Sequence, residues 1–313
     1  MPADDQGLIR RRRRTSVPPA LLLLAGVALQ APAQEPEPRT YSPNPVGANF
    51  LVVGYSRSSG EVLFESTVPL SDVDAEFNAV TVAFERTFGM FGRAASVLVA
   101  APYVWGDASG NVGEETESIT RSGPGDPRLR LSINLAGGPA LTPAEFAHRK
   151  PTTTLGASLT VVPPLGQYDS TRLINIGANR WSFKPELGVS YPVGRWYLEG
   201  YAGVWLFTDN DDFFGGARRE QDPVGALQLH ASYTFRPRLW FAVDSTWYAG
   251  GRSTVDGVKN DDRQSNTRVG LTLSVPLGAR QSLKFSWSEG ATTRIGGDFN
   301  TIGVAWQHVW LPR

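Results

Sequence analysis

The residues with the widest chemical repertoire in this chain are its three histidines, His148, His230 and His308. None has a second ligand at the spacing that a zinc or iron site requires, so we predict no metal site. The chain contains no cysteine, which excludes thiol catalysis, disulfides and cysteine-ligated zinc. It also lacks the G-x-S-x-G turn that presents a nucleophilic serine. We therefore predict no catalytic residue and no cofactor.

Two acidic runs and one glycine run are the other candidates for binding chemistry. Asp209-Asn210-Asp211-Asp212 and Asn260-Asp261-Asp262 offer oxygen ligands for calcium but lack the spacing of a calcium loop. Solvated loops are the simpler interpretation. Gly123-Pro124-Gly125 has neither the Gly-Lys-Ser ending nor the following helix of a phosphate loop, so it predicts a turn.

The N-terminal residues 1–33 have the pattern of an export signal. Arg10 to Arg14 form a positive cluster, Val17 to Leu29 form an apolar run too short to cross a bilayer as a helix, and Ala31-Pro32-Ala33 supplies small residues for cleavage. We expect cleavage after Ala33. Removing five arginines and two aspartates from 30 basic and 30 acidic residues leaves 25 and 28, a net charge of −3. This balance argues against a nucleic-acid partner.

The mature chain alternates polar and apolar residues with a period of two, which is typical of β-strands. In Arg128-Leu129-Arg130-Leu131-Ser132-Ile133-Asn134-Leu135, the apolar residues share one face and the polar residues share the other. The same alternation predicts twelve strands, near residues 48–57, 77–88, 94–105, 127–136, 152–162, 181–191, 196–207, 224–235, 239–248, 265–275, 282–290 and 299–310.

The connections between these strands alternate between short turns and long polar loops, such as 106–126, 163–180, 208–223 and 249–264. An even number of strands with this alternation predicts an all-β fold, an antiparallel transmembrane β-barrel of the outer-membrane type. The predicted domains are a signal peptide (1–33), a periplasmic N-terminal segment (34–47) and the barrel (48–313). Within residues 61–76, we expect Val62, Phe64, Val68 and Leu70 to fold into or over the lumen as a constriction.

A soluble β-sandwich is the competing fold, because it also alternates polar and apolar positions. Charged residues in the fourth to tenth predicted strands all lie on the polar face, as a lipid-exposed barrel requires. Large aromatic residues form two girdles on the apolar face. Trp181, Trp247 and Trp287 lie at the ends near the long loops, and Tyr191, Trp196, Phe235 and Trp310 lie at the ends near the short turns.

The polar face of a barrel lines its lumen, so inward-facing residues are the candidates for solute passage and selectivity. They are Arg128, Arg130, Arg180, Lys184, Glu186, Glu199, Tyr197, Tyr201, Trp205, His230, Asp244 and Arg268. Phe207 shares this face and, with the tyrosines and Trp205, offers apolar steps for an aromatic solute. The turn at 236–238 places His230 opposite Asp244. The excess of basic over acidic residues predicts a mild preference for anionic or neutral solutes.

Two other function classes remain open for such a barrel. Some outer-membrane barrels are lipases that use a serine and a histidine. Here His308 is predicted to face lipid, whereas Ser286 and Ser288 on the preceding strand face the lumen, so these residues do not form the pair. The other alternative is a structural or adhesive barrel, for which the loops are rather short.

Several runs of the sequence resemble a known family, the outer-membrane transporter-like proteins of the group labelled MetA-pathway of phenol degradation. They are Phe84 to Arg93 with Pro102-Tyr103, Ser122 to Arg128, Asn134 to Leu141, Pro164 to Tyr168, Asn175 to Glu186 and Trp205 to Asn210. The resemblance implies a barrel for transport, nominally in the degradation of aromatic compounds. We expect passive passage of small aromatic or hydrophobic solutes. The expected partners are outer-membrane lipid, lipopolysaccharide, the barrel-assembly machinery and the small-molecule solute.

Overall fold

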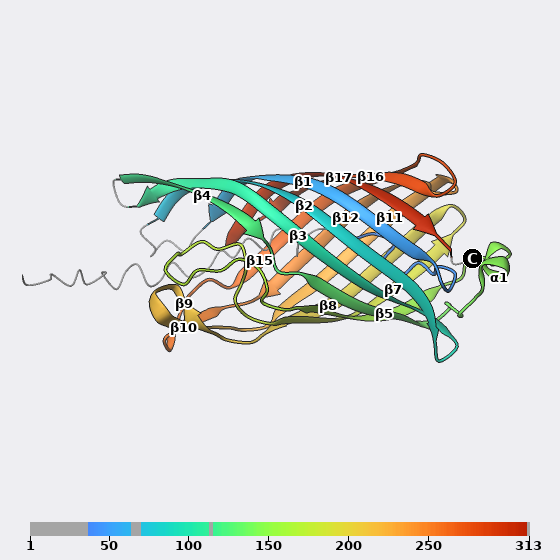
Figure 1. Cartoon of the computed structure of the whole chain (residues 1–313), viewed down its shortest axis with the longest axis horizontal. Coiled ribbons are helices and arrows are strands. Elements are labelled where there is room, and N and C mark those ends of the chain that lie inside the picture. Colours follow the sequence, from blue (N-terminus) through green and yellow to red (C-terminus); the bar gives the residue numbers. More distant parts are fainter. Residues whose placement is uncertain (1–36, 64–69, 113–114, 312–313) are drawn as a thin grey trace, which may run out of the picture.

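The computed structural model of the protein describes residues 37–63, 70–112 and 115–311, which form an antiparallel β-barrel (Figure 1). The predicted signal peptide lies outside the described residues. In chain order the elements are β1 (Asn49–Leu63), β2 (Leu70–Met90), β3 (Arg93–Val112), β4 (Glu115–Pro124), β5 (Arg128–Ala136), α1 (Pro143–Ala147), β6 (Thr154–Val162), β7 (Ser182–Val193), β8 (Trp196–Phe207), β9 (Asn210–Phe213), η3 (Phe214–Gly216), β10 (Ala217–Gln221), β11 (Val224–Arg236), β12 (Leu239–Gly250), β13 (Ser253–Val255), β14 (Val258–Lys259), β15 (Gln264–Pro276), β16 (Gln281–Thr292) and β17 (Gly296–Trp310).

The barrel wall has twelve strands, as predicted. β4 and β5 both pair with β3, along Tyr103–Val112 and Ala95–Ala100 respectively, so together they make one strand of the wall. This strand is interrupted at residues 125–127. The wall closes because β2 pairs with β1 and β3, and β1 also pairs with β17. Each predicted strand overlaps an observed one, and the fold prediction is confirmed.

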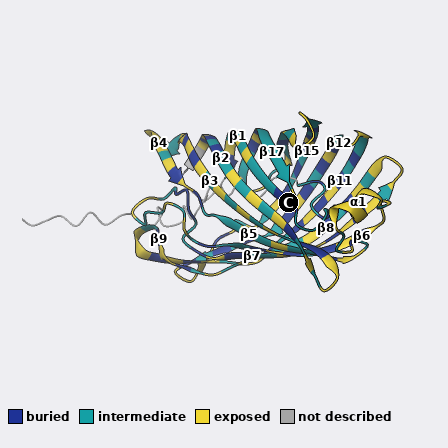
Figure 2. Ribbon diagram, turned by 45° about the vertical axis from the view of Figure 1, so that its right-hand side comes forward, coloured by how far each residue is buried: buried dark blue, intermediate teal, exposed yellow. Residues whose placement is uncertain are grey.

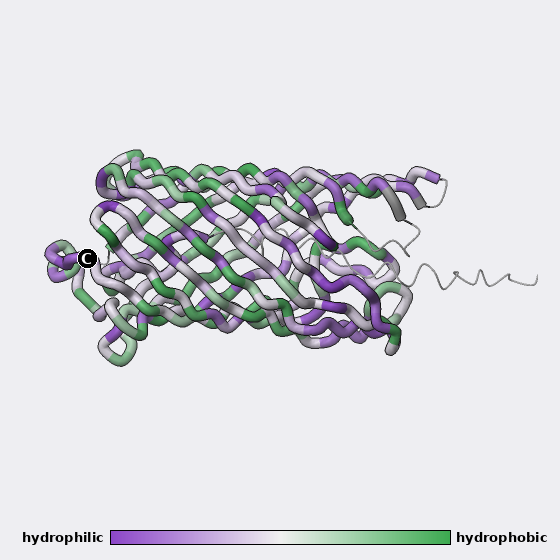
Figure 3. Tube along the Cα trace, turned by 180° about the vertical axis from the view of Figure 1, so that it is seen from behind, coloured by the Kyte–Doolittle hydropathy of each residue, from purple (hydrophilic) through white to green (hydrophobic). Residues whose placement is uncertain are grey.

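Exposed and buried residues alternate along the strands of the wall, and so do apolar and polar residues (Figures 2 and 3). The exposed large side chains are apolar and many of the buried ones are polar, so the outer surface of the barrel is apolar and the inner surface is polar. On β5, Leu129 and Leu131 are exposed on the outside, whereas Arg130 points inward. Trp181 and Trp247 are exposed on the outer face near the long loops, and Tyr191, Trp196 and Phe235 are exposed near the short turns. This arrangement matches the lipid-facing band and aromatic girdles of an outer-membrane barrel. None of the described helices is long and apolar enough to cross a membrane.

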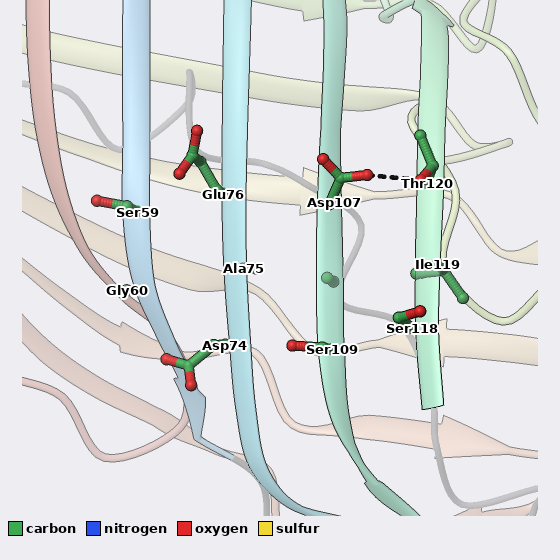
Figure 4. A pocket seen from close by; sticks show the side chains of 11 residues that line it. Ser59, Gly60, Asp74, Ala75, Glu76, Asp107, Ser109, Ser118, Ile119 and Thr120 are labelled. Atoms are coloured by element: carbon green, nitrogen blue, oxygen red, sulfur yellow. Dashed lines mark hydrogen bonds between the residues drawn. The ribbon is translucent and has the colours of Figure 1, made fainter. Parts of the chain in front are cut away.

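The wall extends beyond the apolar band where β1, β2 and β3 continue past their predicted ends and β4 pairs with β3. β2 has 21 residues and β3 has 20, about twice the length that spans an outer membrane. Here the polarity of the two faces is inverted, with polar residues outside and apolar residues inside. Figure 4 shows Asp74, Glu76 and Asp107 on the outward face, around a shallow hollow of 480 Å³.

Two sequence predictions are wrong in this region. Residues 106–126 were expected to form a long loop, but β3 continues to Val112 and β4 follows from Glu115. Residues 61–76 were expected to form a constriction, but β1 continues to Leu63 and β2 begins at Leu70. Val62 does point inward, whereas Phe64 and Val68 lie outside the described residues. The alternation pattern did not predict these parts of the strands, because their outward faces lie beyond the lipid-facing band and are polar.

The long loops cover one end of the barrel. β9, β10, β13 and β14 form a separate small sheet at this end (Figure 1). The connection from β6 to β7 folds back and is held by Asp126, whose carboxylate accepts hydrogen bonds from the Gly166 N–H (2.7 Å) and the Ala178 N–H (2.8 Å). Ile176 of this connection is buried among inward residues of β1, β2, β3 and β17. The loop end is therefore narrowed by an ordered connection.

Candidate functional site in the barrel lumen

The segment before β1 occupies the lumen. Tyr41 is 1% exposed, and its hydroxyl lies 2.9 Å from Ser158 Oγ and donates to Glu186 Oε1 at 3.0 Å. Its ring packs edge-on against Tyr201, with 5.1 Å between the ring centroids. The sequence predicted residues 34–47 to be a periplasmic segment. For the described part, the contacts with inward-facing side chains place it inside the barrel instead.

Glycines on two adjacent strands make room for the Tyr41 ring. Gly156 on β6 pairs with Gly188 on β7, and both face inward. A Cβ atom at Gly156 would lie 2.1 Å from Tyr41 Cδ1, and one at Gly188 would lie 2.2 Å from Tyr41 Cε2. Real side chains do not approach so closely, so the wall accepts this ring only because both positions lack a side chain.

Glu37, at the start of the described segment, neutralises two candidate selectivity residues. Its carboxylate lies 2.6 Å from Arg130 Nη1 and 3.5 Å from Arg128 Nη1. Burial raises the pKa of Glu37, but the charges of Arg130, Arg128 and Lys184 outweigh burial and hold the pKa at about 2. The carboxylate therefore stays charged at neutral pH. The basic excess behind the predicted anion preference is correspondingly smaller.

His230 and Asp244 face each other across β11 and β12, in the predicted register. His230 Nδ1 lies 2.7 Å from Asp244 Oδ1, and Thr272 donates to Asp244 Oδ2 at 2.9 Å. Both side chains are almost fully buried. Among the described residues, His230 Nε2 has no hydrogen-bond partner, so the serine that a hydrolase would need on this nitrogen is not in place.

The other candidate residues also point inward. Lys184 Nζ lies 2.8 Å from Glu186 Oε2. Arg268 donates to Ser288 Oγ (3.1 Å) and to the Phe299 carbonyl (2.9 Å). Glu199 Oε2 accepts the Arg39 backbone N–H at 2.8 Å. Nearer the loops, Arg180 donates to Gln221 Oε1, and its guanidinium carbon lies 4.2 Å from the Phe207 ring centroid.

The loop-side half of the lumen is lined by two apolar clusters. In one, Trp205 packs with Val224, Ala226 and Tyr248, and partly buried Val162 and Phe207 pack against them. The other joins Phe77, Val104, Ile176 and Phe299 with Val62, Val73, Ala75, Ala79 and Ala108. Among the described residues, Tyr41 packs against Tyr201, whereas Trp205 and Phe207 belong to the cluster nearer the loops.

The N-terminal segment packs closely against one side of the lumen wall. Towards β2, β3 and β5, the cavity between wall and segment has a volume of 30 Å³, about one water molecule. Besides Arg268, the opposite wall, formed by β15, β16, β17 and β1, carries several short inward side chains. They are Thr272, Ser274, Ser286, Ser288, Thr301, Ser56 and Ser58. These hydroxyls make the inward surface polar on this side of the lumen.

The acidic loop runs are engaged by arginines. Arg218 forms ion pairs with Asp209 (2.5 Å) and Asp211 (3.5 Å). Asp261 lies 3.5 Å from Arg252 and 3.0 Å from Arg294. Within the described ranges, no group of three histidine, aspartate or glutamate side chains is arranged to hold a metal ion. His308 stacks between Trp306 and Trp310, whereas Ser286 and Ser288 belong to the inward set.

The sequence predictions missed Glu37, Arg39 and Tyr41, which lie before the first strand in a segment without periodicity. One signal was available. Gly156 and Gly188 stand at inward positions of adjacent predicted strands, and such a pair indicates the close approach of another group.

The twelve-stranded wall, apolar outside and polar inside, defines the class of this protein as an outer-membrane β-barrel. The family model described as Putative MetA-pathway of phenol degradation matches residues 57–300. The chain belongs to this family.

Solved structures show the same fold. The chain is similar to an outer membrane channel from Pseudomonas putida F1, with 23% identity, a TM-score of 0.74, and coverage of 88% of this chain and 100% of that one. It is also similar to the β domain of the Bordetella autotransporter BrkA, with 11% identity, a TM-score of 0.50, and coverage of 85% and 100%. No curated protein matches the chain.

Proposed function

We propose that the protein is an outer-membrane channel for passive passage of small solutes with apolar or aromatic character. The observation that carries this proposal is the apolar cluster around Trp205, which lies in the lumen on the loop side of Tyr41. A purely hydrophilic pore has no need of a buried indole on its path. Among the described residues, we see no comparable feature that supports an enzymatic or adhesive role.

In the proposed mechanism, a solute enters from the loop end and contacts the apolar clusters. It then follows the hydroxyl-lined wall past the N-terminal segment. Tyr41 and the Glu37 ion pairs fix that segment and limit the size of what passes. Larger solutes require the segment to leave. No step in this scheme needs an energy source, because the solute moves down its own gradient.

The test is single-channel recording in planar bilayers. We expect small openings for the wild type, with the ion current reduced by 4-hydroxybenzyl alcohol but much less by xylose at the same concentration. Trp205→Ala should weaken the block by the aromatic alcohol by roughly fivefold, because stacking on an indole contributes about 1 kcal/mol. Trp247→Ala, on the outer face, is the matched control. Equal block by both solutes would contradict the aromatic preference.

Replacing Glu37 with glutamine should shift ion selectivity towards anions, because one negative charge beside Arg128 and Arg130 is removed. We expect the anion-to-cation permeability ratio to rise by roughly two- to threefold, measured as a reversal potential across a salt gradient. The wild type should show the same change on acidification. The pKa of Glu37 is lowered from 4.5 to about 2, so its pairing is complete above about pH 4.5 and is lost as the pH falls towards 2.

Glu117→Gln provides the control for this prediction, since it removes the same charge from an exposed position on β4. Its reversal potential should equal that of the wild type. If Glu37→Gln also leaves the potential unchanged, the two arginines do not line the conducting path.

A further inference from the structure

The Arg39 side chain is held in a cage built by the barrel wall. Its guanidinium carbon lies 4.6 Å from the ring centroid of Tyr197 on β8 and 4.6 Å from that of Trp240 on β12. Between these strands, β11 supplies two hydroxyls. Arg39 Nε donates to Ser232 Oγ at 3.0 Å, and Nη2 donates to Thr234 Oγ1 at 2.7 Å. Two aromatic rings and two acceptors therefore surround one planar cation.

The strand register builds this cage without help from Arg39. Ser232 pairs with Tyr197 across β11 and β8, and Thr234 pairs with Trp240 across β11 and β12. Trp240 is 8% exposed, and Ser232 is fully buried. The cage is thus part of the rigid wall, whereas its occupant belongs to the segment that precedes the barrel.

A buried carboxylate lies beside the cage. Glu199 is 4% exposed, and its Oε2 accepts the backbone N–H of Arg39 rather than the guanidinium. The neighbouring buried pair, His230 and Asp244, is already internally bonded. Glu199 therefore supplies a negative charge for a cation in the cage and, in addition, an acceptor for a second N–H group of the same ligand.

We propose that Tyr197, Trp240, Ser232, Thr234 and Glu199 form a binding site for planar organic cations of the guanidinium or amidinium class. Arg39 is its occupant in this structure, and a solute bearing such a group takes the site when Arg39 leaves. The proposal rests on the proposed channel function, because a solute has to enter the lumen before it can reach the site. Two ring contacts and two hydroxyl acceptors suit a flat cation with several donors better than a tetrahedral ammonium. The site would thus allow the lumen to bind an organic cation even though many basic residues line it.

The test compares binding of phenylguanidinium with binding of phenylurea, a neutral molecule of the same shape, to the detergent-solubilised barrel by isothermal titration calorimetry. Arg39→Ala empties the cage and changes no wall residue. We expect this variant to bind phenylguanidinium at least about tenfold more tightly than the wild type, and to bind phenylurea much more weakly. Adding Glu199→Gln to Arg39→Ala should weaken phenylguanidinium binding by about tenfold. Heat-modifiable migration on gels checks that each variant is a folded barrel.

Absence of phenylguanidinium binding to folded Arg39→Ala, or equal binding of phenylurea, would overturn the proposed site. Conductance recordings on the same preparations separate this result from the channel proposal. If Arg39→Ala conducts but binds no cation, only the site is refuted. If Arg39→Ala binds the cation but neither the wild type nor Arg39→Ala conducts, the channel function is refuted and the binding site remains.

Discussion

A barrel that lacks residues 34–45 should conduct far more current than the intact mature chain, on the order of tenfold more in planar bilayers. The described part of this segment bonds with strands from β2 to β12 and leaves only 30 Å³ on one of its sides. Removing it leaves a lumen limited by inward wall side chains and by the connection from β6 to β7. Permeation by xylose should rise in parallel, because the larger opening is no longer selective for size.

A Gly-Ser linker of the same length in place of residues 34–45 is the control for this deletion. It keeps the chain length but removes Glu37, Arg39 and Tyr41, so it should conduct almost as well as the deletion. If both variants conduct like the wild type, the segment does not obstruct the conducting path. If the deletion increases conductance but the linker variant does not, the volume of the segment blocks the lumen, and the contacts of Glu37, Arg39 and Tyr41 are not required for the block.

Gly188→Val should open the channel through one wall residue. A Cβ atom at this position would lie 2.2 Å from Tyr41 Cε2 and 2.7 Å from Tyr201 Cδ1, so Tyr41 must leave. Losing a fully buried aromatic contact costs about 3 kcal/mol, which lowers the equilibrium constant for docking of the segment by roughly a hundredfold. Conductance should approach that of the deletion.

The absence of cysteine in the chain allows a direct check of segment release. A single cysteine at Ser42 should react slowly with a water-soluble maleimide in the otherwise native chain and much faster when combined with Gly188→Val. Gly200→Val is the matched control, because a Cβ atom there meets only Leu229 Cδ2 at 3.6 Å. Equal labelling rates for Gly188→Val and the control would show that Tyr41 remains docked despite the clash.

The barrel itself was predictable from the sequence because lipid imposes a strict pattern on each strand. The Leu and Arg alternation from Arg128 to Leu135 identifies both faces of β5, and tight-turn geometry sets the pairing of His230 with Asp244. The prediction failed where lipid no longer touches the wall. Asp107 and Ser109 face outward on β3, and inward apolar residues such as Val104 and Ala108 alternate with the wrong phase for a lipid-facing strand.

The occupied lumen was not predictable for a different reason. Tyr41 meets Ser158 and Glu186, which are 117 and 145 residues away in the chain, and no periodic signal connects them. Inward orientation of the candidate residues followed from strand phase. The interaction partners of these residues could not be predicted from strand phase, because Glu37 and Arg39 come from a segment without helices or strands. A polar lumen can be inferred from the alternation in each strand. Whether the N-terminal segment fills that lumen depends on contacts between residues that are far apart in the sequence.

The covalent attachment of the segment to β1 through Ala48 has a kinetic consequence. Once undocked, residues 37–47 remain tethered at the mouth of the lumen, at an effective concentration in the millimolar range for so short a connection. Re-docking is then intramolecular and does not depend on protein concentration. Open intervals should accordingly be brief flickers whose duration is set by the tether. A free peptide of residues 34–48 added to the deleted barrel would need millimolar amounts to restore the same closed fraction.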